Sequence, residues 1–195
     1  AYMALDLVPG ADLHEVLDQH SERLTPDFLE QALRQSLDAL GHIHGHGILH
    51  RDIAPDNICV DQNGGIMLID FGAASRTVTG VDASGAIMAV KDGYSPYEFY
   101  SRADDQDASS DLYSLGATFY HLITGQVPPS GRDRRAALRL GDPDPLVPLC
   151  DGDWALGYHL LSTIDRALRV EKAGRFHSAS AWVLSLIHIS QPTRP

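Results

Sequence analysis

The longest periodic stretch of apolar residues predicts a helix that begins near residue 25. Thr25 is a capping hydroxyl, Pro26 suits the first helical position, and Asp27 puts an acid at the positive helix end. Gly45 and Gly47 are residues that end helices. Between these signals apolar residues recur at roughly 3.6-residue spacing, at Phe28, Leu29, Ala32, Leu33, Leu37, Leu40 and Ile43. The pattern predicts one amphipathic helix with a buried face.

Two short apolar runs follow this helix, at 58–60 and 66–69. Asn63-Gly64-Gly65 lies between them, and these residues tolerate the positive φ that a tight turn needs. The pattern predicts a β-hairpin. The next segment, from Gly72 to about Ser109, is rich in Gly, Ser, Asp and Thr and is too long for a passive connection. We expect it to be a functional loop.

A second helix is predicted to start at Ser110-Asp111 and to end at Gly125. Its near-uniform apolarity is typical of a helix buried on all sides. Further helical stretches are expected at 132–140 and 155–170, separated by a proline-rich loop at 142–149. The predicted fold is a mainly helical α+β domain with one small hairpin and one long central loop.

Composition narrows the possible functions only slightly. The 195 residues are enough for one sizeable core, with 44% hydrophobic and 21% charged residues. Acidic residues outnumber basic ones, 26 against 15, which argues against binding nucleic acid or anionic lipid. Cys59 and Cys150 are too few for a disulfide framework, so we expect a reducing cytoplasm. No apolar run is long enough to span a membrane, and no signal segment opens the chain.

Both ends of the chain look unlike those of a natural protein. It opens with an apolar run at 1–7 that has no start methionine or capping signal. At the other end, residues 184–195 break the preceding helical pattern and resemble the translation of a sequencing-library adapter. We interpret 184–195 as an artefactual tail and exclude it from fold reasoning. The alternative is a genuine amphipathic helix end followed by a proline-rich tail.

Two motifs carry the chemistry. His50-Arg51-Asp52-Ile-Ala-Pro-Asp-Asn57 is followed, 18 residues after Asp52, by Asp70-Phe71-Gly72. Here the sequence resembles the protein-kinase superfamily, whose catalytic loop reads His-Arg-Asp-x-x-x-x-Asn and whose metal-binding triplet is Asp-Phe-Gly. The resemblance implies that Asp52 accepts the proton of the substrate hydroxyl, and that Asn57 and Asp70 hold the magnesium ions of Mg²⁺·ATP.

The resemblance extends to structural and regulatory positions. Tyr94-Ser-Pro-Tyr-Glu98 resembles the end of an activation segment, and Arg175 stands where an arginine forms a buried ion pair with the residue at Glu98. Asp111 stands where kinases place an aspartate that braces the backbone of the catalytic loop. The resemblance also implies that the His50 ring packs under Phe71.

Arg51 stands where a kinase arginine often binds a phosphate carried by the activation segment. Such a phosphate can order a loop by pairing with the arginine. Four hydroxyl residues of this chain are candidate acceptors: Ser75, Thr77, Thr79 and Ser84.

The first residues resemble the hinge between the two lobes of a kinase, at Leu5-Asp-Leu-Val-Pro-Gly10. By this resemblance Leu5 is the gatekeeper, and the backbone of Asp6 and Val8 binds adenine. Asp12 reaches the ribose hydroxyls. Cys59 and Ile69 line the nucleotide site, with Cys59 in the adenine floor. We therefore expect a hinge at 1–10 and a C-terminal lobe at 11–183.

Two positions depart from the family pattern. Most serine/threonine kinases carry lysine two residues after the catalytic aspartate, and this chain has Ala54. The usual threonine seven residues before Glu98 is Lys91. Our hypothesis is a swap, in which the Lys91 ammonium takes the place vacated at Ala54 and contacts the transferring phosphate. The alternative is that Lys91 is a solvated loop residue, as most lysines are.

Two clusters suggest metals but lack complete ligand sets. The histidines His42, His44, His46 and His50 have no cysteine or acid to complete a zinc site, and His50 already belongs to the catalytic loop. We expect His44 to face the core and His42 and His46 to face water. Asp104, Asp105 and Asp107 lack the spacing of a calcium loop and are interpreted as a solvated loop.

The leading interpretation is the C-terminal lobe of a bacterial-type serine/threonine protein kinase that uses ATP and Mg²⁺ on protein substrates. Neither a glycine-rich phosphate loop nor a strand lysine is present, so we expect this fragment alone to be inactive. Two alternatives stay open. One is a pseudokinase that binds and scaffolds, which Ala54 favours. The other is a small-molecule phosphotransferase of the aminoglycoside or choline kinase type, which usually lacks Arg51 and the 96–98 anchor.

Overall fold

The computed structural model describes residues 10–71, 75–76, 90–100 and 106–187, without the side chains of 75 and 76. Its main helices are α1 Leu13–Gln19, α2 Pro26–Gly45, α3 Ala108–Thr124, α4 Gly131–Leu140, α5 Tyr158–Ala167 and α6 Ala179–Ile187. Its strands are β1 Ala11–Asp12, β2 Ile48–Leu49, β3 Ile58–Val60, β4 Ile66–Leu68 and β5 Ser75–Arg76. Short 3₁₀ turns are η1 Ser21–Arg23, η2 Pro55–Asn57, η4 Tyr97–Tyr100, η5 Leu149–Asp151 and η6 Lys172–Gly174.

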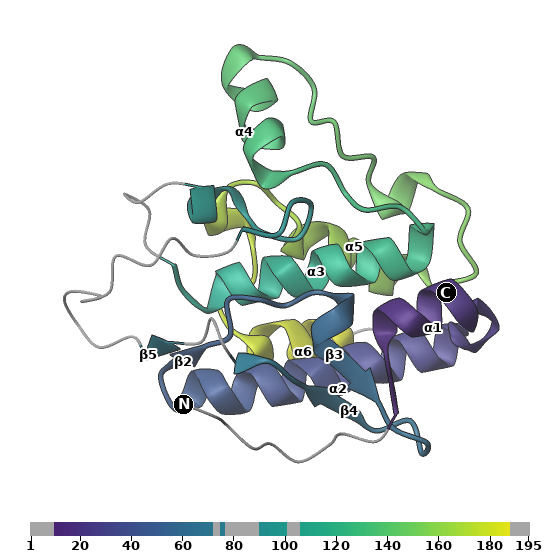
Figure 1. Ribbon diagram of the computed structural model, residues 1–195. Helices are drawn as coiled ribbons and strands as arrows, with labels where there is room; N and C mark the ends of the chain where they lie inside the picture. The colour runs from purple at the N-terminus through teal and green to yellow at the C-terminus, as the bar shows by residue number, and fades with distance from the viewer. Residues whose placement is uncertain (1–9, 72–74, 77–89, 101–105, 188–195) are drawn as a thin grey trace, which may run out of the picture.

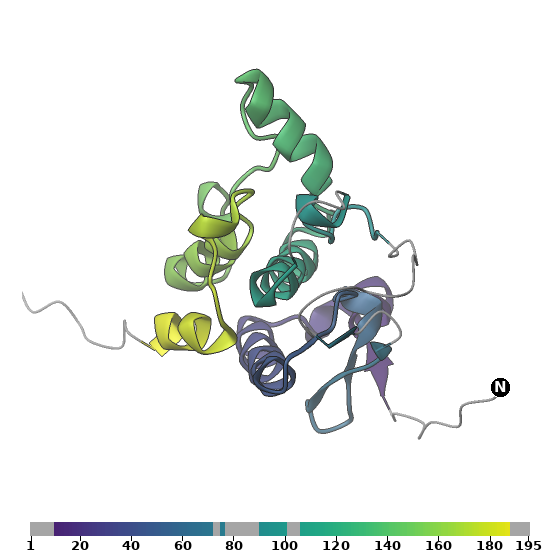
Figure 2. The same cartoon turned by 90° about the vertical axis from the view of Figure 1, so that its left-hand side faces the viewer.

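Helices form the body of the molecule, and a small sheet lies against one side of it (Figure 1). Helix α3 runs through the middle, with α2 and α5 packed against it and α6 bridging α2 and α5. Helix α4 projects away from this body, as both views show (Figure 2). This arrangement confirms the predicted mainly helical α+β fold.

The central helix α3 is buried along nearly its whole length, from Ser109 to Leu122. A Cβ added at Gly116 would lie 3.1 Å from Ala167 Cβ, so glycine lets α3 approach α5 closely. The buried character was predicted from the sequence, but the start of the helix was not. Asp107, interpreted above as a solvated loop residue, is the N-cap: its carboxylate accepts a hydrogen bond from Ser109 N at 2.8 Å, and Ser110 completes a capping box.

Other helix boundaries differ from the prediction for identifiable reasons. Helix α5 is shorter than the expected 155–170, because the extended backbone of Gly157 caps its start and Leu168 caps its end. The Asp165 carboxylate on this helix accepts hydrogen bonds from the amides of Leu149 and Cys150 and ties the preceding turn to it. Helix α6 continues past the predicted break at 184, since Leu186 is buried and Ser185 O accepts a hydrogen bond from His159. The seven-residue helix α1 was not predicted.

Helix α2 begins as predicted, with Thr25 Oγ1 accepting a hydrogen bond from Phe28 N at 3.2 Å. Strands β3 and β4 form the predicted antiparallel hairpin, and β1 adds to the other edge of β3. Gln35 on α2 ties the hairpin to the helix, because its amide oxygen accepts from Ile66 N and its amide nitrogen donates to Gly64 O. A second, two-stranded sheet joins β2 to β5. The segment between β2 and β3 is therefore held at both ends.

In the part of the chain that the structure describes, no helix has the length and apolarity to cross a membrane. Cys59 and Cys150 are both free thiols. The division into hinge, lobe and tail stays a prediction, because residues 1–9 and 188–195 lie outside the described ranges.

Candidate active site

The loop between β2 and β3 positions Asp52 and Asn57 against each other. Asn57 sits at the end of the 3₁₀ turn η2 and is almost fully buried. Its side-chain nitrogen donates to the Asp52 main-chain oxygen at 2.7 Å and to Asp52 Oδ2 at 2.9 Å. The second bond fixes the orientation of the Asp52 carboxylate, which is 22% exposed. The loop therefore presents a carboxylate oxygen to solvent in a defined direction.

A buried carboxylate from α3 holds the same loop in an unusual backbone conformation. Arg51 has a φ of 67°, in the left-handed region that non-glycine residues seldom occupy. Asp111 Oδ1 accepts from Arg51 N at 2.8 Å, and Oδ2 accepts from His50 N at 2.9 Å and contacts His44 Nε2 at 2.8 Å. Strain of this kind persists only where surrounding contacts enforce it. Asp111 supplies those contacts.

Hydrogen bonds from the main chain bring the second motif beside the first. Ile69 N donates to Asn57 O at 3.0 Å, and His50 Nε2 donates to Ile69 O at 3.1 Å. The next residue, Asp70, also has a left-handed φ, of 58°, and is exposed. The His50 ring lies 4.7 Å from the Phe71 ring, between centroids. Asp52, Asn57 and Asp70 are thus held next to one another, although they come from two segments.

His50 is held as a neutral imidazole in one tautomer. Burial lowers the pKa of His50 below its ordinary value near 6.5, against the opposing influence of Asp111, Asp52 and Asp70. Because Nε2 donates to Ile69 O, Nδ1 is left as an acceptor facing Asp52 N at 3.4 Å. A proton on Nδ1 would place two donors opposite each other.

The donor atoms at this site fit magnesium. The carboxylate of Asp70 and the amide oxygen of Asn57 are hard oxygen ligands, and the nitrogen of Asn57 is already engaged with Asp52. Among the described residues no group of three His, Cys, Asp or Glu side chains could enclose a metal ion. Mg²⁺ prefers one or two protein ligands completed by water and substrate phosphates, which this pair allows.

Lys91 lies in the site, although it follows Asp52 by 39 positions in the sequence. Its Nζ is 2.7 Å from Asp56 Oδ1, 2.8 Å from Asp56 Oδ2 and 3.7 Å from Asp52 Oδ1. It is therefore an ion-paired residue and not a lone solvated lysine. Sequence reasoning missed its partner Asp56, whose only sequence signal is its place directly before Asn57.

The turn after Lys91 is anchored on α3. Tyr94 OH and His121 Nδ1 share a hydrogen bond of 2.7 Å. Burial raises the pKa of Tyr94 to about 12, with a further contribution from the Asp56 charge. Burial also lowers the pKa of His121. The two groups hold the loop that carries Lys91 against the helical body.

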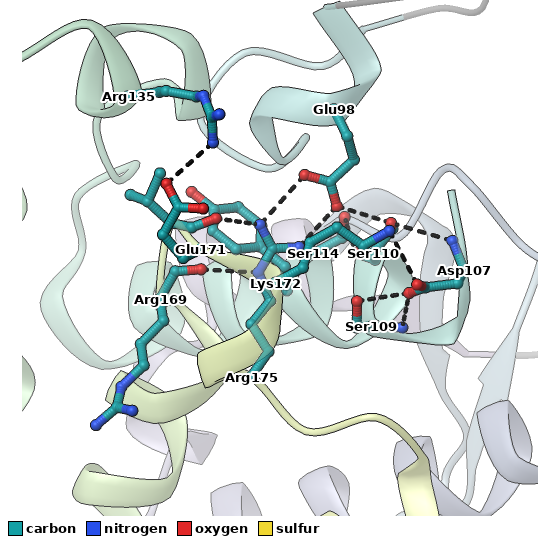
Figure 3. Close-up of polar contacts among 12 residues, drawn as sticks. Glu98, Asp107, Ser109, Ser110, Ser114, Arg135, Arg169, Glu171, Lys172 and Arg175 are labelled. Carbon is teal, nitrogen blue, oxygen red and sulfur yellow. Dashed lines mark hydrogen bonds and ion pairs between the residues drawn. The ribbon is translucent and has the colours of Figure 1, made fainter. Parts of the chain in front are cut away.

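A second cluster of charged residues surrounds Glu98, seven residues after Lys91 in the sequence (Figure 3). Arg175 donates to Glu98 Oε1 at 2.7 Å and Oε2 at 3.2 Å, and both side chains are fully buried. Arg175 also donates to the main-chain oxygens of Arg169 and Val170, and Ser110 Oγ donates to Glu98. Every oxygen of the buried carboxylate therefore has a partner.

The remaining predicted positions are those that the resemblance assigns to the nucleotide site and to the second motif. Asp12 Oδ1 caps α1 by accepting from Glu15 N at 2.7 Å, a role that sequence reasoning did not assign. Cys59 is buried in β3 beside Asp12, and burial, followed by the Asp12 charge, raises the pKa of its thiol. Ile69 is partly buried. Leu5, Asp6, Val8 and Gly72 lie outside the described residues.

The positions expected to take part in regulation are only partly described. Arg51 Nε is buried and has no hydrogen-bond partner among the described residues. Of the four candidate phosphate acceptors, Ser75 lies in β5, where its backbone pairs with Leu49 beside the catalytic loop. Thr77, Thr79 and Ser84 lie outside the described ranges.

The histidine cluster has structural contacts. His42 and His46 are exposed, with ring centroids 4.7 Å apart and ring planes tilted by 45°, and His46 Nδ1 contacts His42 O at 2.8 Å. His44 is turned toward Asp111, as described above.

The strained loop at Arg51, the adjacent exposed Asp70 and the buried Glu98–Arg175 pair on a helical body match the pattern of a protein kinase. The chain belongs to the protein kinase domain family, whose profile matches residues 1–145.

Curated relatives are serine/threonine kinases of bacteria and a kinase of mouse. Serine/threonine-protein kinase PknB of Mycobacterium tuberculosis is 27% identical over 199 residues, covering 100% of this chain and 31% of the relative. Sperm motility kinase Z of Mus musculus is 30% identical over 127 residues, covering 65% of this chain and 25% of the relative. The chain therefore spans between a quarter and a third of the length of these relatives.

The solved structure titled "PpkA-294 apo form" has the same fold. It matches with a TM-score of 0.77 and 27% sequence identity, covering 92% of this chain and 61% of that one. Together with the family match, this similarity confirms the predicted protein-kinase-like fold.

Proposed function

We propose that this chain is the C-terminal catalytic lobe of a serine/threonine protein kinase that transfers the γ-phosphoryl group of ATP to a protein hydroxyl. The observation that carries the proposal is the juxtaposition of Asp52, Asn57 and Asp70, held by hydrogen bonds through Ile69 and His50. Phosphoryl transfer requires little else from the protein than positioning and cations. The relatives named as serine/threonine-protein kinases support the class of substrate.

In the proposed reaction the substrate hydroxyl oxygen bonds to the γ-phosphorus as the bond from that phosphorus to the β–γ bridging oxygen breaks. The hydroxyl proton passes to Asp52, whose carboxylate is oriented by Asn57 and partly open to solvent. Asn57 and Asp70 would hold the magnesium, which would supply positive charge opposite the phosphate oxygens. Asp12, Cys59 and Ile69 contribute to the nucleotide site, together with Leu5, Asp6 and Val8.

The complete reaction is proposed to need an N-terminal lobe that supplies a phosphate-binding loop. The isolated chain is expected to be inactive, since the nucleotide would lose half of its contacts. The two free cysteines are compatible with a reducing compartment, and we propose a cytoplasmic site of action.

The test uses a protein that joins this chain to its N-terminal lobe. Magnesium-dependent transfer of phosphate from labelled ATP to a generic protein substrate is measured for the wild type and for Asp52→Asn. Transfer that falls at least about 10³-fold in Asp52→Asn is the expected result, because loss of the base leaves positioning alone. Nucleotide binding without any transfer would support the pseudokinase alternative. Transfer only to small alcohols would support the small-molecule kinase.

A further inference from the structure

We infer that Lys91 supplies a positive charge to the transferring phosphoryl group, and that Asp56 is the positioning residue that aims its ammonium. The inference rests on the proposed function and assigns two further residues to the same site. It builds on the hypothesis that the Lys91 ammonium replaces the lysine missing at Ala54. It adds the Asp56 carboxylate, which holds that ammonium in place.

The first step is the position of the ammonium. Nζ of Lys91 lies 3.7 Å from Asp52 Oδ1, the oxygen of the proposed base that does not accept from Asn57. A hydroxyl bound to that oxygen would bring the attacked phosphorus into the same space. A cation beside it would face the phosphate oxygens where charge is greatest.

The second step is the hydrogen-bonding capacity of the ammonium. An ammonium has three N–H donors. Two of them are used by Asp56, at 2.7 and 2.8 Å, and the distance of 3.7 Å to Asp52 is too long for a hydrogen bond. Within the described residues, one donor is left for a phosphate oxygen.

The third step is the strength of the anchor. The Lys91 side chain is 32% exposed and that of Asp56 is 47% exposed. Pairs of this exposure contribute little to stability because water competes with them. Lys91 can therefore exchange one Asp56 oxygen for a phosphate oxygen without disturbing the fold.

The fourth step is the backbone on which Lys91 stands. Lys91 O accepts hydrogen bonds from Tyr94 N and Ser95 N, and Lys91 N donates to Ser95 Oγ at 3.0 Å. Gly93 has a φ of 86°, and a Cβ there would lie 2.3 Å from Val127 Cγ1, so the turn admits only glycine. The Cα of Lys91 is thus fixed, and only its side chain needs to be aimed.

The fifth step is the lack of a charged side chain at Ala54, two residues after Asp52 in the same loop. Ala54 is fully buried and carries only a methyl group. No cation can come from that position of the loop, so the one that faces Asp52 is delivered by the segment containing Lys91.

The chain offers a matched control. Lys91 and Lys172 are its only two lysines. Lys172 pairs with Asp107 at 2.9 Å, with exposures of 25% and 55% that resemble those of Lys91 and Asp56. Lys172→Met therefore removes a similar ion pair away from Asp52.

The first experiment measures turnover in the protein that includes the N-terminal lobe. Lys91→Met is expected to lower kcat about 10²-fold, the loss typical of one charge-stabilising donor, with a smaller change in KM for ATP. Lys91→Arg should recover part of that loss, and Lys172→Met should stay within about threefold of wild type. A Lys91→Met enzyme as active as Lys172→Met would overturn the inference and leave the kinase function intact, provided that Asp52→Asn abolishes transfer.

Asp56 is tested by a double-mutant cycle. Asp56→Asn alone is expected to lower kcat by at most about fivefold, and it should have no effect in the Lys91→Met background, because the residue acts through Lys91. A residue that only stabilises the loop would lower kcat equally in both backgrounds. Equal losses would therefore refute the positioning role.

A readout independent of turnover is the reactivity of the two lysines toward an amine acetylating reagent, followed by peptide mass spectrometry. Binding of Mg²⁺ with a non-hydrolysable ATP analogue should protect Lys91 and leave Lys172 unchanged. Equal reactivity of Lys91 with and without the bound analogue would contradict contact with phosphate. Protection without any phosphate transfer would sustain the contact while refuting the proposed kinase activity.

Discussion

Two of the clusters of carboxylate and cation among the described residues differ mainly in burial. Glu98 and Arg175 are fully buried, and the ion pair is enclosed by further hydrogen bonds from Ser110 and to two main-chain carbonyls (Figure 3). Lys91 faces Asp56 and Asp52 with all three side chains between 22% and 47% exposed. Both clusters join a cation to carboxylates, but one is shielded from water and the other is partly open to it.

The difference in burial separates a structural role from a functional one. A buried charge that loses its partner cannot be solvated. Removing either Glu98 or Arg175 therefore destabilises the fold, because the remaining charge is left without compensation. An exposed pair is solvated with or without its partner and adds little stability. It can open to admit a substrate. We expect the buried cluster to control stability and the exposed cluster to control turnover.

The largest effect is expected from breaking the buried cluster. Arg175→Met leaves the Glu98 carboxylate buried without its cation and should lower the free energy of unfolding by about 3–5 kcal/mol. Urea denaturation followed by circular dichroism measures this change. A loss below about 1 kcal/mol would mean that the pair is not the anchor that its burial indicates. The reciprocal variant Glu98→Gln retains an acceptor oxygen and serves as the milder comparison.

A smaller effect is expected at Asp111, which is as buried as Glu98 but touches the catalytic loop. Asp111→Asn replaces one acceptor oxygen by a donor facing a main-chain amide. The free energy of unfolding should fall by about 2–3 kcal/mol, and kcat should fall as well, since Arg51 loses support for its strained φ. Full activity in a variant destabilised to this extent would show that the loop conformation does not depend on Asp111.

The pH dependence of stability gives a third test. Unfolded His50 takes up a proton near pH 6.5, whereas the folded imidazole, whose pKa is lowered by burial, does so only at lower pH. Between these values the unfolded state binds more protons, so the free energy of unfolding falls as pH decreases. The stabilisation is fully present above about pH 6.5 and is lost as pH falls through the folded pKa.

His50→Gln should make this pH dependence shallower. Urea titrations at several values between pH 7.5 and 5.5 measure the slope for both proteins. His121, whose pKa burial also lowers, contributes in the same direction and is unchanged in the variant, so part of the slope remains. Parallel slopes for wild type and His50→Gln would contradict the assignment to His50.

The smallest effect on stability is expected at the exposed cluster. Lys91→Met should change the free energy of unfolding by less than about 1 kcal/mol, the usual limit for an exposed ion pair, while its turnover falls. The change in the free energy of unfolding should be compared directly with that of Arg175→Met, measured in the same denaturation series. A Lys91→Met variant destabilised as much as Arg175→Met would remove the distinction between the two clusters.

Sequence signals were most reliable where the information is local. The start of α2 was predicted because Thr25 and Pro26 are adjacent to the residues that they cap, and the β3–β4 hairpin because Asn63-Gly64-Gly65 forms its own turn. The start of α3 was placed too late, because Asp107 looked like one more member of an acidic loop until its hydrogen bonds to Ser109 were seen. The length of α5 was overestimated by three residues at each end, since the structure places its caps at Gly157 and Leu168.

The sequence by itself determined the helical class of the fold, the hairpin and the identity of the two motifs, because period, caps and turn residues act within a few positions of one another. Only the tertiary structure decided that Lys91 meets Asp56, 35 positions away. The pairing of Glu98 with Arg175, 77 positions apart, was expected from the resemblance to kinases, but its further partners among the main-chain carbonyls and Ser110 were seen only in the structure. These contacts depend on how helices pack and where the loops between them run. Burial, and with it the division between a structural charge pair and a chemically available one, is a property of that packing and not of the residues alone.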